Sequence, residues 1–132
     1  LEINVVAPYM CMQHAIRLMV QGGRPGKILN IGSVRSHWAW AGESGVYPAS
    51  KFGLRGMTEA VAREMHWRKL PISVGLISPG ETNTLMTNPE GLPAPHAMDP
   101  ADVAAAIVHA LSAPDGVNVY DTILFPLSMR PW

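Results

Sequence analysis

The sequence has little of what several classes of protein depend on. A single cysteine, Cys11, excludes an internal disulfide, and its place in an apolar helical stretch predicts a small core residue. The five histidines do not follow metal-ligand spacing, so we expect no metal site. No apolar run approaches the ~20 residues that span a bilayer. We therefore expect no membrane segment, and a cytoplasmic protein is the default expectation.

Charge is sparse and balanced along the chain. Ten lysines and arginines stand against ten acidic residues, for a formal net charge of zero. A neutral chain with scattered basic residues gives no electrostatic footprint for nucleic acid, so no such partner is expected. With 132 residues, of which 48% are hydrophobic, the composition predicts one globular domain over 1–132.

Apolar segments alternate with amphipathic ones. We predict strands at 27–32, 71–78 and 118–125, and helices at 3–21, 47–69 and 100–112. Strands that alternate with helices favour an α/β fold with a parallel sheet. Gly22 and Gly23 indicate a helix-ending turn, and Asp99 before Pro100 indicates a helix N-cap. The proline-rich segment 81–98 predicts a long loop, either a functional lid or disordered.

The most informative stretch is Tyr47-Pro-Ala-Ser-Lys51. Residues four apart share a helix face, so the Lys51 ammonium is expected beside the Tyr47 hydroxyl. A neighbouring cation lowers the pKa of a phenol, which makes tyrosine a usable proton donor and acceptor. Ser33, at the end of a buried strand, is placed to hold a substrate oxygen. Taken alone, the same spacing also fits a solvated helix face.

The order of these features resembles the catalytic half of the short-chain dehydrogenase/reductase family. A strand ends in Ser33, the Tyr47–Lys51 pair opens a helix, and Pro79-Gly80 ends a second strand before Thr84. The resemblance extends from Asn4 to the last strand near Phe125. It implies a partial Rossmann-like three-layer fold and hydride transfer between a nicotinamide cofactor and a carbonyl or alcohol substrate.

The glycine-rich phosphate-binding turn of that family, T-G-x-x-x-G-x-G, is missing, and so is its N-N-A-G stretch. The chain opens at Leu1, inside a stretch with helical character. We therefore expect a truncated gene or a fragment, and little activity or cofactor binding from this chain alone.

The resemblance assigns roles residue by residue. The catalytic residues implied are Asn4, Ser33, Tyr47 and Lys51. The residues implied for NAD or NADP binding are Tyr47, Lys51, Pro79, Gly80, Thr82 and Thr84. The substrate pocket is expected to involve Arg35, Trp38, Trp40 and Met86. Two tryptophans and a methionine near the site would favour an apolar ligand.

The resemblance also implies partners. The expected substrate is a small alcohol or ketone, and a homo-oligomer is expected through the helices at 3–21 and 47–69. Two alternatives remain open at this point: a truncated, non-catalytic module that serves as a binding or assembly partner, or an inert fragment. The sequence does not separate them, because relic active-site residues would look the same in all three cases.

Overall fold

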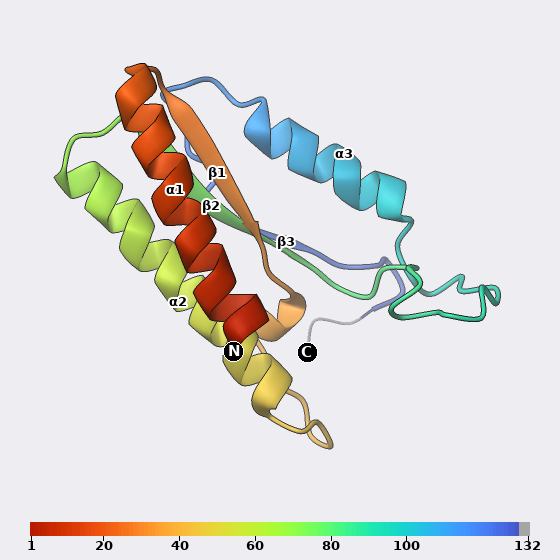
Figure 1. Cartoon of the computed structure of the whole chain (residues 1–132). Helices are drawn as coiled ribbons and strands as arrows, with labels where there is room; N and C mark the ends of the chain where they lie inside the picture. The colour runs from red at the N-terminus through yellow and green to blue at the C-terminus, as the bar shows by residue number, and fades with distance from the viewer. Residues whose placement is uncertain (130–132) are drawn as a thin grey trace.

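The computed structural model describes residues 1–129 and contains one parallel sheet between two helical layers (Figure 1). The elements are a π-helical turn η1 (Glu2–Val6), α1 (Ala7–Gly22), β1 (Gly26–Ile31), a 3-10 turn η2 (Val34–Ser36), α2 (Val46–Trp67), β2 (Ile72–Pro79), α3 (Pro100–Leu111) and β3 (Asp121–Leu124). The strand order is β1-β2-β3, and both pairings are parallel. Helices α1 and α2 cover one face and α3 lies over the other (Figure 1). The predicted α/β class is confirmed.

The core lies between β2 and the helix pair. Val74 and Ile77 of the central strand are fully buried, because neighbouring strands flank β2 and helices cover it. Met12 of α1 packs with Val61 and Met65 of α2 against Val74. These helix positions recur at helical spacing, so the amphipathic pattern of the sequence correctly marks the faces that meet the sheet.

The first helix begins differently from the prediction of one helix over 3–21. Pro8 has no N–H and cannot donate an α-helical hydrogen bond to the Asn4 carbonyl. The chain instead starts with the π turn η1, in which the Ala7 N–H bonds to Glu2, and α1 follows. Helix α1 ends in the predicted turn: Gly23 follows its last residue and has a φ of 63°, in the left-handed region. Cys11 is exposed, so its prediction as a core residue is wrong.

The last strand is shorter than the predicted 118–125. It pairs with β2 only over Asp121–Leu124, opposite Leu76 to Pro79. Just before it, the Asn118 side chain donates to the Val74 carbonyl at 3.0 Å, where a ladder bond would otherwise form. The backbone also passes so close to Gly75 that a Cβ there would lie 2.4 Å from the Val119 oxygen. Residues 118–120 thus run beside β2, where the Leu76 N–H donates to the Tyr120 carbonyl at 2.8 Å just before the strand begins.

Candidate active site

Tyr47 and Lys51 lie one turn apart at the start of α2. The helix begins after Gly45, whose φ of 75° turns the chain into it. The Lys51 ammonium nitrogen lies 5.8 Å from the Tyr47 ring centre and donates a 3.3 Å hydrogen bond to the Ile31 carbonyl at the end of β1. Loss of hydration on burial lowers the pKa of Lys51 from its ordinary value. The lysine therefore ties the start of α2 to the carboxyl edge of the sheet.

Ser33 follows β1 directly and caps the short turn η2. Its hydroxyl oxygen accepts from the Arg35 N–H at 3.1 Å, and its own N–H donates to the Ser36 hydroxyl at 3.2 Å. These two reciprocal bonds form a capping box that fixes the backbone at Ser33. The Ser33 hydroxyl proton has no acceptor among residues 1–129 and is available to a ligand oxygen.

Asn4 reaches α2 rather than the cleft. Its side-chain amide donates to the Ser50 hydroxyl at 3.0 Å, and Ser50 in turn donates to the Tyr47 carbonyl at 2.8 Å. Ser50 is buried, and it joins the first turn of the chain to the helix turn that carries Tyr47 and Lys51. Sequence reasoning missed Ser50, although it stands directly before Lys51.

The turn after β2 supplies the opposite side of the site. The Gly80 N–H donates to the Leu124 carbonyl at 2.7 Å, and a Cβ on Gly80 would lie 3.1 Å from Pro126. A larger residue would therefore push this turn away from β3. The Thr82 hydroxyl donates to the Gly80 carbonyl at 3.0 Å, which holds the following loop against the strand end.

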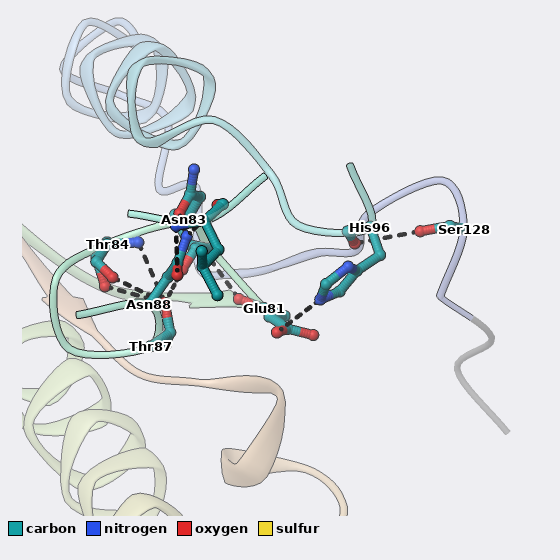
Figure 2. Close-up of polar contacts among 10 residues, drawn as sticks. Glu81, Asn83, Thr84, Thr87, Asn88, His96 and Ser128 are labelled. Carbon is teal, nitrogen blue, oxygen red and sulfur yellow. Dashed lines mark hydrogen bonds and ion pairs between the residues drawn. The ribbon is translucent and has the colours of Figure 1, made fainter. Parts of the chain in front are cut away.

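The segment after Gly80 is an ordered loop held by its own polar contacts (Figure 2). The Thr87 hydroxyl accepts from the Thr84 N–H at 3.1 Å and donates to the Thr82 carbonyl. Nearer the stem, His96 Nε2 lies 3.1 Å from a carboxylate oxygen of Glu81 (Figure 2). Such internal bonding favours an ordered loop over the disordered segment that the sequence left open.

One cleft of about 760 Å³ joins these elements at the carboxyl ends of β1 and β2. Its lining includes Ser33, Arg35, Tyr47, Lys51, Pro79, Gly80, Thr82, Thr84 and Met86. Sequence reasoning missed the wall that α3 contributes, which consists of Pro100, Val103, Ala104 and Ile107. The signal was weak, because an apolar helix face predicts core packing as readily as a cleft.

The structure does not bring the two predicted tryptophans to the cleft. Trp38 packs on Phe125, with ring centres 5.7 Å apart, and Trp40 lies beneath Arg35 with its ring centre 3.4 Å from the guanidinium carbon. Neither lines the cleft, whereas Arg35 and its ion-pair partner Glu43 do. That side of the cleft is therefore polar, which removes the tryptophans as an argument for an apolar ligand.

Two other kinds of feature are absent from the described residues. Within residues 1–129, no group of three or more His, Cys, Asp or Glu side chains is placed to hold a metal ion. Across the same part of the chain, no helix has both the length and the apolar character needed to cross a membrane.

Comparison with known proteins relates the chain to dehydrogenases and reductases. A model of the short chain dehydrogenase family matches residues 1–93. Farnesol dehydrogenase of Aedes aegypti is 30% identical over an alignment of 132 residues that covers 98% of this chain and 54% of that protein. Carbonyl reductase family member 4 of Danio rerio is 37% identical over an alignment of 123 residues that covers 86% of this chain and 49% of that protein.

The fold is similar to that of an alcohol dehydrogenase from the archaeon Thermococcus sibiricus, solved in complex with 5-hydroxy-NADP. The TM-score is 0.83 at 19% identity, over 99% of this chain and 54% of that chain. The chain thus spans about half the length of the relatives it matches. Since the family model covers 93 of the 132 residues, and the strand order and helix layers agree with it, the chain belongs to the short-chain dehydrogenase family.

Proposed function

We propose that this chain carries the catalytic centre of an NAD(P)-dependent oxidoreductase. The reaction is a hydride exchange between a nicotinamide ring and the carbon of a small ketone or alcohol. The observation that carries the proposal is that Ser33, Tyr47 and Lys51, which come from two separate elements, line one cleft at the carboxyl ends of parallel strands. Open α/β sheets bind their ligands at this edge.

Tyr47 is the proposed general acid and base. Its side chain is 43% exposed and lines the cleft, so a substrate oxygen can approach the hydroxyl. Ser33 donates its free hydroxyl proton to the same oxygen and fixes the substrate against Tyr47. Lys51 keeps a cation near the phenol, with its ammonium nitrogen 5.8 Å from the Tyr47 ring centre. Together these groups move a proton while the substrate is held in place.

A nicotinamide cofactor, when bound, supplies the hydride. The polar residues at the end of β2 fit its carboxamide end, because Thr82 and Thr84 line the cleft beside the Pro79-Gly80 turn. Two of the three Lys51 N–H donors remain beyond its bond to Ile31, and they suit a ribose hydroxyl. The family's phosphate-binding turn has no counterpart in this sequence, so binding of the pyrophosphate needs groups from outside this chain.

Asn4 is proposed as a positioning residue for this centre. Its contact with Ser50 connects η1 to the turn of α2 between Tyr47 and Lys51. The role that the resemblance implies, holding a water molecule for a proton relay with Lys51, stays a proposal.

A fluorescence titration of the 132-residue chain with NADH and NADPH tests this function. Saturable binding that is lost in Lys51→Ala would support the proposal, because this change removes the cation that faces the cofactor. Tyr47→Phe is tested in an enzyme completed with the missing pyrophosphate-binding groups, where it should keep cofactor binding and abolish turnover, since the ring remains and the proton donor is gone. Turnover by Tyr47→Phe in that enzyme would refute the assignment. If the isolated chain binds neither cofactor at millimolar concentration, the titration is repeated with the completed enzyme, and a lack of binding there would favour a non-catalytic module.

A further inference from the structure

Arg35 is a fixed cation in the cleft wall. It stands two residues after Ser33, and its guanidinium lies on the Trp40 ring with the guanidinium carbon 3.4 Å from the ring centre. Its Nη2 nitrogen forms an ion pair with a carboxylate oxygen of Glu43, and the two side chains are only 22% and 28% exposed. The aromatic ring therefore holds one face of the guanidinium and a carboxylate holds one edge.

The ion pair uses only part of what Arg35 offers. A guanidinium has five N–H donors in its plane, and stacking on a ring occupies its face while leaving these donors in place. The Nη1 nitrogen is buried and has no hydrogen-bond partner among residues 1–129. An unpaired buried donor is costly, so a native structure normally provides it with an acceptor. Because Nη1 is buried, an acceptor reaches it only after the group that covers it has moved, and a group with two oxygens could then bond Nη1 and Nη2 together.

Glu43 is held loosely compared with Arg35. It lies between Gly42 and Gly45, which have φ values of 85° and 75°, and a Cβ added to either glycine would meet no other atom within 4 Å. The surrounding turn is exposed. The carboxylate is therefore carried on a turn that little packing fixes, and it can leave Arg35 without disturbing the core.

We propose that Glu43 holds the place of a substrate carboxylate, and that Arg35 selects alcohols and ketones that carry a carboxylate group. The inference rests on the proposed function, since it names the substrate class of the same cleft. An incoming carboxylate that displaces Glu43 keeps the charge on Arg35 balanced and forms a two-oxygen contact in the guanidinium plane. A neutral substrate offers no such exchange and leaves the internal pair intact.

The other charged residues of the cleft are compatible with a carboxylate ligand. Lys51 is the second cation at the cleft, and Glu81 is the second carboxylate. Glu81 lies 3.1 Å from His96 Nε2, so it has a partner of its own on the loop stem. Once Glu43 has moved away, the Ser33 and Tyr47 side of the cleft presents Arg35 and Lys51 to the ligand.

The test uses butyrate and butyramide, which have the same shape and differ in charge. The ¹⁵N-labelled chain is titrated with each at constant ionic strength and pH 7, and the Arg35 side-chain Nε–H signal is followed. We expect butyrate to shift this signal saturably and butyramide to leave it unchanged at the same concentration. Equal shifts with both compounds, or no shift with butyrate, would overturn the proposal. Tighter binding of inorganic phosphate than of butyrate would overturn the choice of carboxylate.

Glu43→Gln makes the test sharper, because it removes the internal competitor and keeps its shape. We expect the apparent Kd for butyrate to fall about two- to fivefold, the scale of one partly exposed ion pair. Glu59→Gln is the matched control: it breaks the partly exposed Arg63–Glu59 pair of α2, which does not line the cleft, and should leave the Kd unchanged. An unchanged or weaker affinity in Glu43→Gln would contradict the exchange.

Arg35→Lys gives a third arm that keeps the positive charge and loses the two-donor edge. It should weaken butyrate binding while the backbone spectrum stays native. None of these measurements needs cofactor or turnover, so their failure is distinct from that of the proposed function. Butyrate binding as expected, together with full turnover by Tyr47→Phe in the completed enzyme, would keep the carboxylate site and refute the catalytic assignment.

Discussion

At the scale of single residues, His37 makes a buried polar contact close to the segment that carries Ser33. His37 ends η2, four residues after Ser33, and its side chain is only 8% exposed. Its Nε2 nitrogen lies 3.2 Å from one carboxylate oxygen of Asp121. The other carboxylate oxygen of Asp121 lies 3.7 Å from Arg55 Nε. This contact ties the segment that carries Ser33 and Arg35 to the start of β3.

Burial lowers the pKa of His37 from its ordinary value; Asp121 raises it and Arg55 lowers it by smaller amounts. The unfolded chain, with a histidine pKa of about 6.5, therefore binds more protons than the folded chain as the pH falls through that value. Stability is full above about pH 6.5 and decreases below it. We expect the urea concentration at the unfolding midpoint to decrease when the pH is lowered from about 7 to about 5. In His37→Gln this decrease should be smaller.

His66→Gln is the control, because His66 is exposed near the end of α2. It should keep the pH dependence of the unmodified chain. A His37→Gln variant with the same slope as the unmodified chain would show that other groups cause it.

At the scale of elements, α3 begins at a helix N-cap that the sequence predicted, and it lines the cleft, which the sequence did not predict. The Asp99 carboxylate accepts from the Ala101 N–H at 2.8 Å, and Pro100 follows at the first helical position. The predicted cap is therefore confirmed. The same helix supplies an apolar wall of the cleft, so the cap also supports the site.

Asp99→Ala removes an acceptor that satisfies one of the free N–H groups at the helix start. We expect a loss of about 1 kcal/mol in the free energy of unfolding, measured by urea denaturation. Asp99→Asn keeps a side-chain oxygen and should lose much less. Asp115→Ala, in the exposed turn after α3, is a second control with no expected effect. A full-sized loss in Asp99→Asn would point to charge rather than to capping.

At the scale of the whole molecule, α1 and α2 leave apolar side chains outside the sheet contact. Val6, Tyr9 and Met10 of the first helical segment and Phe52 of α2 are each at least 41% exposed. Exposed apolar groups that gather on neighbouring elements mark association surfaces. A two-fold homo-oligomer through these helices stays a prediction, as does a cytoplasmic location.

Light scattering of the purified chain at micromolar concentration tests the oligomer. We expect a mass of at least twice 14.3 kDa, and Met10→Asp should shift it toward the monomer because it puts a charge into the contact. Leu85→Asp is the matched control, since Leu85 is 80% exposed on the loop after β2. A monomer in the unmodified chain would contradict the prediction.

The sequence by itself determined the elements and the family. Periodicity located every α-helix and strand in the described residues to within a few residues, because each element buries a face whose spacing it must repeat. Local signals at Gly23 and Asp99 were equally reliable, since their bonds form within one turn of the chain. The spacing of Tyr47 and Lys51 belongs to the same class, as residues four apart on a helix are neighbours in any fold.

Only the tertiary structure decided which side chains meet across the chain. Trp38 and Trp40 are close to Ser33 in sequence, yet both turn to packing contacts, while Glu43 and the face of α3 reach the cleft. Just before β3, the Asn118 side chain bonds to the backbone of a strand residue 44 positions away. Cys11 is exposed because the apolar stretch around it presents only one face to the sheet. Such outcomes depend on how separate elements pack, and no local pattern encodes that arrangement.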